Sequence, residues 1–296
     1  MKSLFILDGS WYIFRAYYWL PELKDEQWRS VHAIFGFFRL YFKLLQKKPD
    51  YVVIAWDSPV KTLRKEMYEE YKANRPKLPD DFKYQIKMIK QLTKDLWIPH
   101  IEVPTFEADD IIATVAKAEF DQPIQRVVVS ADKDLKQLIR EDISVIDPNK
   151  DHEVTYSSFK FDQGFEPEYL LDYLALIGDT SDNVPGVAGI WPKTAQKLIE
   201  EYQTIENIYA HIDDIKASTQ QKLRDWREAA DLSKVLITLM DVPWFSNLSL
   251  DNFSPKIDHD LMHRILIVEN GFASLKKYVD QMKLDSQKWV QLGLFG

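Results

Sequence analysis

The sequence predicts an α/β domain built on a mostly parallel sheet, followed by a helical domain. Three short apolar runs in the first half of the chain end in acidic residues: Leu4–Asp8, Tyr51–Asp57 and Arg126–Asp134. A continuous apolar run bounded by polar residues is typical of a strand buried on both faces, as in a parallel sheet. Segments with helical apolar spacing separate these runs up to residue 163, and from about Gly164 the strand signal fades.

The expected helices follow in order along the chain. Residues 12–18 are rich in aromatics, and Val31–Leu45 has the apolar spacing of a helix, which Pro49 ends. Another helix is expected over about residues 109–119. In the second half we expect helices at Glu166–Ile177, Thr194–Tyr202, Gln221–Leu239 and His259–Met282, before a short exposed tail.

The composition is that of a soluble globular protein. The chain has 296 residues, of which 46% are hydrophobic and 28% charged. No apolar stretch reaches bilayer length and no signal peptide is evident, so we expect a cytoplasmic protein with no membrane contact. Cysteine is absent, which excludes disulfides and thiolate metal sites, and the six histidines lack the spacing of a zinc site.

Nine acidic residues occupy positions that an α/β fold brings toward one edge of its sheet. Ligands of open α/β sheets bind outside the carboxyl ends of the strands. Crowded carboxylates repel one another unless cations neutralise them, and oxygen-only ligand sets favour Mg²⁺ or Mn²⁺. The nine are Asp8, Asp57, Glu107, Asp109, Asp110, Asp132, Asp134, Asp179 and Asp182. The pattern predicts a metal site for phosphate chemistry.

Each of these acids alone has an ordinary structural explanation. A single Asp after a strand is more often a turn former or a helix N-cap. The helix dipole also favours acids at a helix start, as at residues 107–110. The metal site is favoured because paired or tripled acids recur after several apolar segments. The net charge of −8 excludes no partner, since bound cations would neutralise the cluster.

Two further segments indicate phosphate binding. Lys and Arg outnumber acids in residues 61–94, and aromatics interleave with them, most clearly in Tyr71–Pro76. Nucleic-acid bases stack on rings while basic side chains track the backbone, although such a run is usually a solvated helix face. Gly186–Ala195 has the glycines and the Pro192 of a hairpin whose second helix presents its N-terminus to an anion, with an ordinary turn as the alternative.

Six motifs run in one order over about residues 4–200. They are Leu7-Asp8-Gly-Ser with Arg15-Ala-Tyr, Ala55-Trp-Asp57, Tyr71-Lys-Ala-Asn-Arg75, Glu107-Ala-Asp109-Asp110, Ser130-Ala-Asp132-Lys-Asp134-Leu and Gly178-Asp179-Thr-Ser-Asp182-Asn-Val-Pro-Gly186-Val-Ala-Gly189-Ile. In this order they resemble the 5′-nuclease superfamily, which includes the 5′→3′ exonuclease domain of bacterial DNA polymerase I, the phage 5′-exonucleases and the flap endonucleases.

The resemblance implies a domain organisation. Residues 1–163 would form a PIN-like (resolvase-like) catalytic domain, with a helical arch at about 72–100 through which single-stranded 5′ ends pass. Residues 164–282 would form a helix-hairpin-helix (H3TH) domain that binds DNA. Residues 283–296 would be a C-terminal tail.

The resemblance also implies roles for individual residues. The nine acids match the family's set for two divalent metal ions, Mg²⁺ with Mn²⁺ as the alternative. Lys72 and Arg75 match bases that steer and stabilise the scissile phosphate, and Arg15 matches a further phosphate contact. Tyr71 matches an aromatic on which a terminal base stacks. The residues matched to duplex binding, in relatives often with a K⁺ ion on backbone carbonyls, are Gly186, Gly189, Lys193 and Thr194.

One position departs from the family pattern. The hairpin normally reads Gly-Ile-Gly-Pro, and here Trp191 replaces the second glycine. We expect this bulky residue to block close approach of the backbone to phosphate or to require an unfavourable conformation. Either effect would weaken duplex binding and K⁺ binding.

The tail carries a separate motif. Gln291-Leu-Gly-Leu-Phe295 resembles the Gln-Leu-x-Leu-Phe peptide by which bacterial proteins dock on the DNA polymerase sliding clamp. The residues matched to clamp binding are Gln291, Leu292, Leu294 and Phe295. A helix end with apolar residues is the alternative, and the terminal position favours docking.

The resemblance implies metal-dependent hydrolysis of phosphodiester bonds near 5′ ends and 5′ flaps of DNA. The enzyme would be a standalone monomer that serves replication and repair and also meets RNA primers. Two alternatives remain. A non-catalytic DNA-structure-binding module is disfavoured by the intact acids with Lys72 and Arg75, and a PIN-type ribonuclease is usually shorter and lacks the hairpin.

Overall fold

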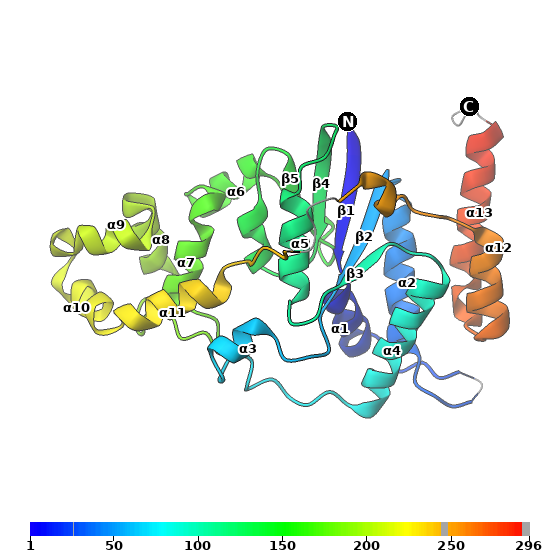
Figure 1. Ribbon diagram of the computed structural model, residues 1–296, viewed down its shortest axis with the longest axis horizontal. Helices are drawn as coiled ribbons and strands as arrows, with labels where there is room; N and C mark the ends of the chain where they lie inside the picture. The colour runs from blue at the N-terminus through cyan, green and yellow to red at the C-terminus, as the bar shows by residue number, and fades with distance from the viewer. Residues whose placement is uncertain (26, 244–247, 292–296) are drawn as a thin grey trace.

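The described residues, 1–25, 27–243 and 248–291, form a six-stranded sheet with helices on both faces (Figure 1). The strand order is β3-β2-β1-β4-β5-β6, in which the first five strands are parallel and β6 is antiparallel to β5. The strands of this computed structural model are β1 (Lys2–Asp8), β2 (Tyr51–Trp56), β3 (His100–Glu102), β4 (Ile124–Val129), β5 (Ile143–Asp147) and β6 (His152–Val154). The predicted mostly parallel sheet is confirmed.

Alternate residues of the central strand pack on opposite faces of the sheet. Leu4 and Ile6 of β1 belong to one core, and Phe5 and Leu7 belong to the other. The first core includes α5 (Ala108–Lys117), and the second includes α1 (Gly9–Trp19), α2 (His32–Leu45) and α4 (Asp80–Asp95). The central strands are therefore buried on both sides, which is why their sequences are continuously apolar.

The turn from β1 into α1 fixes the first acid of the predicted cluster. Asp8 is the N-cap of α1, and its Oδ1 accepts a hydrogen bond from the Trp11 N–H at 2.9 Å. Gly9 follows because a Cβ at this position would lie only 2.4 Å from the Trp56 side chain. The close contact holds the start of α1 against β2.

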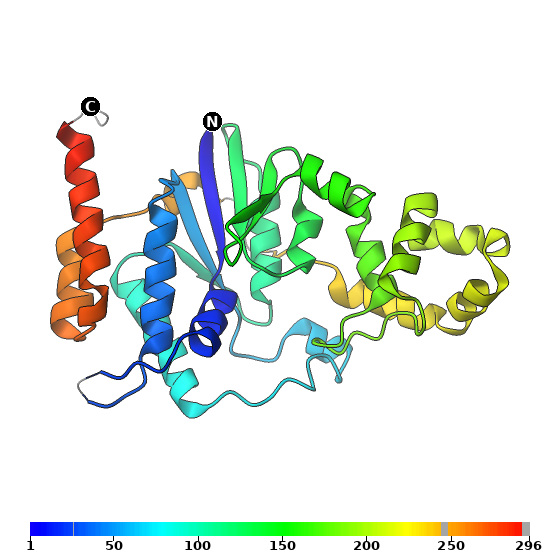
Figure 2. The same cartoon turned by 180° about the vertical axis from the view of Figure 1, so that it is seen from behind.

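Helices α6 to α11 extend away from the sheet beyond β5 and β6 (Figures 1 and 2). They are α6 (Tyr156–Gln163), α7 (Leu170–Ile177), α8 (Pro192–Tyr202), α9 (Ile205–Ala210), α10 (Ala217–Asp225) and α11 (Arg227–Ile237), with the 3₁₀ segments η2 (Pro167–Tyr169) and η3 (Ile212–Asp214). Two further 3₁₀ segments lie against the sheet: η1 (Asp134–Leu138) contacts β5, and η4 (Leu250–Phe253) contacts β2. The single helix expected at 221–239 is broken at Trp226. None of the described helices is long and apolar enough to span a membrane.

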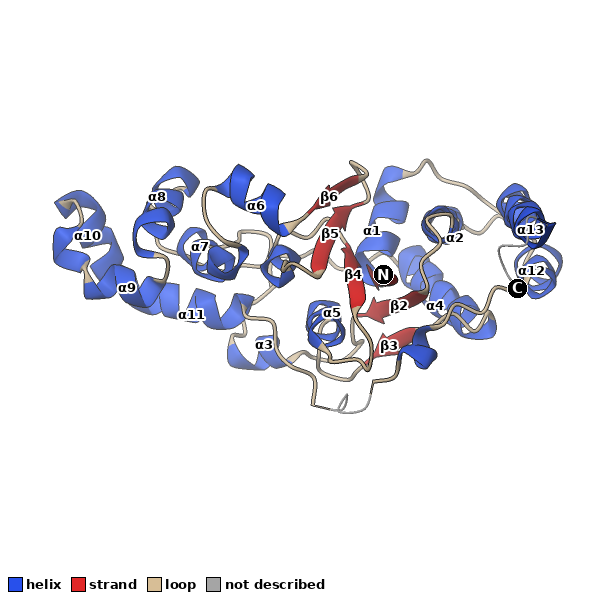
Figure 3. Ribbon diagram, turned by 90° about the horizontal axis from the view of Figure 1, so that it is seen from above, coloured by secondary structure: helices blue, strands red, loops and turns tan. Residues whose placement is uncertain are grey.

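The C-terminal segments return to the sheet domain (Figure 3). They are α12 (His259–Met262), the π-helical η5 (His263–Glu269), the 3₁₀ segment η6 (Ala273–Leu275) and α13 (Lys276–Gln291). Met262, Leu266 and Leu275 share the core that contains α2, and the rings of Phe35 and Tyr278 meet at 6.2 Å. The expected extension of the hairpin domain to residue 282 is therefore wrong, because the apolar stripe of this segment packs on α2 instead.

The expected arch at 72–100 is also too long. Phe82, Ile89 and Leu92 of α4 are buried in the core shared with α2. Helix α4 is thus part of the body of the sheet domain, because its apolar face needs that cover. Only α3 (Leu63–Met67) and the connection 68–79 cross the carboxyl end of the sheet (Figure 1).

Candidate active site

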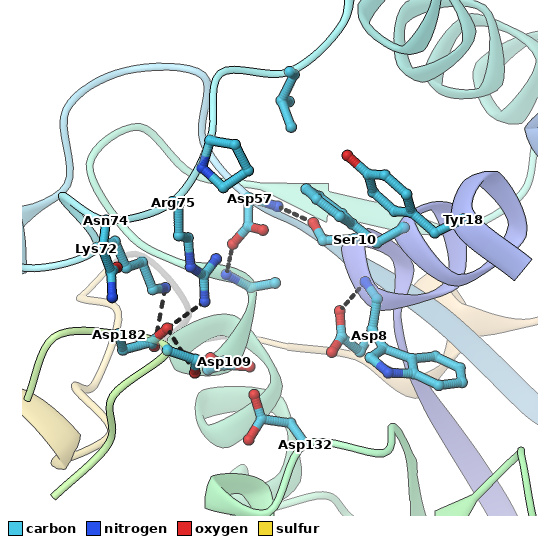
Figure 4. A pocket seen from close by; sticks show the side chains of 16 residues that line it. Asp8, Ser10, Tyr18, Asp57, Lys72, Asn74, Arg75, Asp109, Asp132 and Asp182 are labelled. Carbon is cyan, nitrogen blue, oxygen red and sulfur yellow. Dashed lines mark hydrogen bonds and ion pairs between the residues drawn. The ribbon is translucent and has the colours of Figure 1, made fainter.

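The carboxyl ends of β1, β2 and β4 bring acids to one cavity of about 580 Å³ (Figure 4). Asp8 ends β1, Asp57 follows β2, and Asp132 follows β4. Asp109 in the first turn of α5 and Asp182 in the loop after α7 line the same cavity. These predicted ligands meet because parallel strands end at one edge of a sheet.

A second cavity of about 350 Å³ shares part of this wall. It is lined by Asp132, Asp134, Asp179 and Asp182, which we call the second acid group, while Asp8, Asp57 and Asp109 form the first acid group. The loop that carries Asp179 is held by a two-way backbone pairing with Val184, at 2.9 and 2.7 Å. Its Oδ1 also accepts the Ser181 N–H at 2.7 Å.

The acids raise one another's pKa values. Burial raises the pKa of Asp8 to about 7, and the charge of Asp57 adds to the rise. Burial and the neighbouring Asp132 raise the pKa of Asp134 to about 7. For Asp109, burial and then the charge of Asp132 raise the pKa above its ordinary range. The protein alone therefore disfavours the full negative charge of this site.

The donor set fits divalent cations. Oδ1 of Asp134 is buried and has no hydrogen-bond partner in the described chain, and such an oxygen is costly unless a cation meets it. Within the described ranges no three acidic or histidine side chains already surround one point; Lys72 and Lys133 contact the acids instead. Both groups offer only carboxylate oxygens, the ligands that Mg²⁺ and Mn²⁺ prefer.

Lys72 and Arg75 line the same cavity, next to Asp182 and on the other side from Asp8 (Figure 4). Nζ of Lys72 lies 3.0 Å from Oε2 of Glu107 and 3.8 Å from Oδ2 of Asp182, and Arg75 forms an ion pair with Asp182. Lys72 has a left-handed φ of 54°, and its N–H donates to the Asp182 carbonyl at 2.9 Å. A left-handed lysine costs energy, so the surrounding contacts hold it in place.

Tyr71 and Arg15 do not line this cavity. Tyr71 is only 4% exposed and its hydroxyl donates to Oε2 of Glu107 at 3.0 Å. The expected stacking of a terminal base on Tyr71 is therefore wrong, because the ring is buried. The Arg15 guanidinium lies 5.4 Å from the Trp11 ring and 6.0 Å from the Trp19 ring. Its contact with phosphate stays a prediction.

Asp110, like Glu107, lines neither of the two cavities that hold the acid groups. Nη1 and Nη2 of Arg64 each donate to one of its carboxylate oxygens at 2.7 Å, and the residue is fully buried. Because a forked arginine uses both oxygens, we expect Asp110 not to bind metal directly, in contrast to the prediction from the motif. Glu107 forms a capping box with Asp110 and lines a separate cavity of about 10 Å³ together with Asp109.

The predicted hairpin joins α7 to α8. Gly186 and Gly189 have left-handed φ values of 63° and 79°. Trp191 has φ −96° and ψ 161°, an extended conformation that any residue adopts, and its side chain is 73% exposed. The expected backbone strain at Trp191 is wrong for that reason. Lys193 and Thr194 lie in the first turn of α8, as the hairpin pattern predicts.

Sequence reasoning missed several residues at the site. Trp11, Phe14 and Tyr18 of α1 line the larger cavity. Phe14 and Tyr18 belong to the aromatic-rich run at 12–18 and Trp11 directly precedes it, but periodicity alone does not separate them from the buried Tyr12. Lys133 pairs with Asp179 at 2.7 Å, and its position between two predicted ligands was the available signal.

This fold and site define a two-domain nuclease architecture: a parallel α/β sheet with an acid-lined cavity, joined to a helical hairpin domain. Residues 3–165 match the family model of the 5′-3′ exonuclease N-terminal resolvase-like domain, and residues 165–257 match that of the 5′-3′ exonuclease C-terminal SAM fold. The chain belongs to the 5′-3′ exonuclease family, so the resemblance seen in the motifs is confirmed.

Individual relatives agree with this assignment. The chain is 40% identical over 240 residues to the 5′-3′ exonuclease of Aquifex aeolicus (strain VF5), covering 81% of this chain and 82% of that protein. It is 36% identical over 298 residues to DNA polymerase I of Caldicellulosiruptor bescii, covering 98% of this chain but 35% of the polymerase. The T5 D15 flap endonuclease, solved with DNA and metal ions, shares the fold, with 19% identity and a TM-score of 0.65 over 94% of this chain and all (100%) of that one.

Proposed function

We propose that the protein hydrolyses phosphodiester bonds at or near the 5′ ends and 5′ flaps of DNA with the help of two divalent cations. The observation that carries the proposal is the cavity of about 580 Å³ in which acids of both groups face Lys72 and Arg75. Side chains suited to metal and to phosphate thus line one cavity (Figure 4). Membership of the 5′-3′ exonuclease family supports the same reaction.

The two acid groups would hold one cation each, Mg²⁺ in the first place and Mn²⁺ as the alternative. The first group would act with Glu107, whose carboxylate lies beside Asp109. Bound there, the cations would neutralise the acids, polarise the phosphate and lower the pKa of the attacking water.

The other residues of the cavity would position and stabilise the substrate. Lys72 and Arg75 would offset the negative charge that develops on the phosphate oxygens. Trp11, Phe14 and Tyr18 give the cavity an aromatic wall on which an unpaired nucleotide can rest. The connection 68–79 crosses the carboxyl end of the sheet, where it would limit access to single-stranded 5′ ends.

The hairpin would bind the phosphates of the duplex. Gly186, Gly189, Lys193 and Thr194 surround the N-terminus of α8, where backbone N–H groups and the helix dipole favour an anion. A K⁺ ion on the hairpin carbonyls stays a prediction. Nζ of Lys222 already donates to the Gly189 carbonyl at 2.9 Å, so that oxygen has a cationic partner within the chain.

The test is cleavage of a 5′-labelled flap duplex with Mg²⁺. The natural sequence is compared with Asp109→Asn, which removes a first-group acid, and with Asp162→Asn, a control at an exposed acid of α6. We expect cleavage at the flap junction by the natural sequence and the control but not by Asp109→Asn. Tight flap binding without cleavage by any of the three would support the DNA-structure-binding module, and preferential cleavage of RNA would support the ribonuclease.

We further propose that the tail tethers a monomeric enzyme to the sliding clamp in the cytoplasm. Leu292, Leu294 and Phe295 lie outside the described residues, and Gln291 is the last residue of α13. The support is the match of the tail to the clamp-binding peptide. Deletion of residues 291–296 is expected to abolish clamp binding and to spare cleavage without the clamp. Clamp binding by the truncated protein would refute the tether.

A further inference from the structure

We propose that Arg64 is a positioning residue that fastens the acid helix α5 to the end of α11 and thereby sets the acid site relative to the hairpin. The inference rests on the proposed function, which assigns metal binding to the acids and duplex binding to the hairpin. Arg64 lies in α3, is 3% exposed and lines neither of the two larger cavities. Any effect on the reaction must therefore pass through the residues that it contacts.

The guanidinium of Arg64 joins two elements that are distant in sequence. On α5 it donates to both oxygens of Asp110 at 2.7 Å and to Oε2 of Glu107 at 3.4 Å. At the end of α11 its Nε donates to the Leu236 carbonyl and its Nη2 to the Thr238 carbonyl, both at 2.7 Å. These contacts use all the donors that a guanidinium has. Every donor of the side chain therefore bonds to an acceptor at the start of α5 or at the end of α11.

Asp110 also joins the start of α5 to the segment after α11. Besides the two bonds from Arg64, its Oδ1 accepts the Met240 N–H at 2.8 Å and its Oδ2 accepts the Glu107 N–H at 3.1 Å. Each carboxylate oxygen thus receives two donors, which is the usual capacity of such an oxygen. Asp110 acts as the partner of Arg64 and holds the segment after α11 against the start of α5.

Glu107 connects Arg64 to Lys72, one of the two basic residues that line the larger cavity. Its Oε2 receives Arg64, the Tyr71 hydroxyl at 3.0 Å and the Lys72 ammonium at 3.0 Å. With one oxygen fixed by three donors, the carboxylate is oriented before any ligand binds. Loss of Arg64 would release the start of α5 and disturb both the acid and the lysine that faces it.

The other end of the link reaches the hairpin. Ser233 of α11 is fully buried, and its Oγ accepts the Gly186 N–H at 2.9 Å while donating to the Ala229 carbonyl at 2.7 Å. Helix α11 thus binds the hairpin at Ser233 and the acid helix, through Arg64, one turn later.

The test compares Arg64→Lys with a matched control, Arg126→Lys. Lysine keeps the charge but cannot supply the fork that bridges a carboxylate and two carbonyls. Arg126 of β4 forms an ion pair with Asp142 and donates from Nη2 to the Ala118 carbonyl at 2.7 Å. It resembles Arg64 in chemistry and lies away from the acid groups. The readouts are the melting temperature, Mn²⁺ affinity by titration calorimetry, flap affinity in the presence of a chelator, and the single-turnover cleavage rate with Mg²⁺.

We expect both variants to melt at lower temperature and only Arg64→Lys to change the site. Its Mn²⁺ affinity and single-turnover rate should each fall by about 10–100-fold, the usual effect of losing a residue that orients a metal ligand. Its flap affinity without divalent cations should stay unchanged, because the hairpin itself is intact. Equal Mn²⁺ affinity in the two variants would overturn the proposal and leave Arg64 a structural residue. If the natural sequence binds Mn²⁺ but cuts no flap, the proposed function fails while the Mn²⁺ comparison still decides the role of Arg64.

Asp110→Asn keeps the inference testable if Arg64→Lys does not fold, and the double variant extends the test where Arg64→Lys folds. Asp110→Asn preserves shape but loses an acceptor for the arginine fork. It should lower Mn²⁺ affinity as Arg64→Lys does, and the double variant should be no weaker than the weaker single variant. Additive losses in the double variant would contradict the shared link and would restore Asp110 as an independent metal ligand.

Discussion

The two acid groups reach the cavity wall by different routes. Asp8 and Asp57 come from the ends of β1 and β2 and Asp109 from the first turn of α5, and no ion pair of the described chain includes any of the three. In the second group, by contrast, Asp179 pairs with Lys133 at 2.7 Å, and Asp182 contacts Lys72 and Arg75.

The pKa values of Asp8 and Asp179 differ in the same sense, whereas Asp134 of the second group has a raised pKa like that of Asp8. Burial raises the pKa of Asp8 to about 7. Burial also acts on Asp179, but hydrogen bonds from Lys133 and Ser181 outweigh it and lower the pKa of that carboxyl below its ordinary value. Asp8 therefore depends on bound cations to carry its charge, whereas basic side chains of the chain itself partly neutralise Asp179 and Asp182 of the second group. This difference predicts that the first group matters more to catalysis.

The largest expected effect is the loss of cleavage rate when one acid of the first group is replaced, compared with the loss when one acid of the second group is replaced. Asp109→Asn should lower the single-turnover rate with Mg²⁺ by at least about 10²–10³-fold, because it removes an uncompensated ligand. Asp179→Asn should lower it by about 10-fold, because Lys133 already shields that carboxylate. Equal losses, measured at saturating Mg²⁺ on the same flap duplex, would break the comparison between the groups.

The next largest effect on the cleavage rate is expected from Lys72. Lys72 contacts Glu107 and Asp182 and faces the larger cavity, so Lys72→Met should lower the single-turnover rate by about 10²-fold. Flap affinity should change much less, since the hairpin holds the duplex. Lys72→Arg is the matched control and should retain part of the rate. A loss confined to flap affinity would mean that Lys72 serves binding alone.

Stability of the metal-free protein should depend on pH with opposite signs at Asp8 and at Asp179. The pKa of Asp8 in the folded protein, about 7, exceeds its ordinary value of 3.8. The folded state therefore binds more protons than the unfolded state between these values, and the free energy of unfolding falls as pH rises through that window. Asp8→Asn, which still caps α1, should melt higher than the natural sequence at about pH 8 and equally at about pH 4.

Asp179→Asn is the counterpart. Its pKa is lowered in the folded state, so its charged form contributes stability that is present above the ordinary value of 3.8. The variant should melt lower than the natural sequence at about pH 8, and the difference should shrink as pH falls through the lowered pKa. Thermal melts in a chelator measure both differences, and shifts of the same sign in the two variants would contradict this contrast between Asp8 and Asp179.

The smallest expected effect concerns Lys133. Its ammonium competes with a cation for Asp179, so Lys133→Met should lower the Mg²⁺ concentration needed for half-maximal cleavage. The change should stay below about 10-fold, because the side chain is half exposed and solvent screens its charge. An increased Mg²⁺ requirement would show that Lys133 supports the site instead of competing for it.

The strands that carry acids could be predicted from the sequence because strands buried on both faces are continuously apolar. β1, β2 and β4 are buried on both faces, so each is a continuous apolar run that ends where solvent and the site begin. β3 and β6 have three residues each and mostly exposed or half-buried side chains, which leaves no such run. The positions of Asp8, Asp57 and Asp132 followed from the strand ends alone.

The residues whose positions the sequence did not predict correctly are placed by contacts between segments that are distant in the sequence. Asp110 and Asp109 belong to the same motif. They differ because Asp110 pairs with Arg64, which is 46 residues earlier in the chain, whereas Asp109 lines the cavity. Tyr71 likewise appears as an aromatic between bases, and its burial follows from its contact with Glu107. The apolar spacing after residue 258 predicted helices there, but periodicity does not say that they pack on α2 and not on the hairpin domain.

Anomalous diffraction from crystals soaked in Mn²⁺ tests the central claim most directly. The account predicts two peaks, a strong one among Asp8, Asp57 and Asp109 and a weaker one beside the second acid group. Asp110 should have no peak and should keep its contact with Arg64. The absence of a peak from both cavities, or a peak on Asp110, would contradict the account.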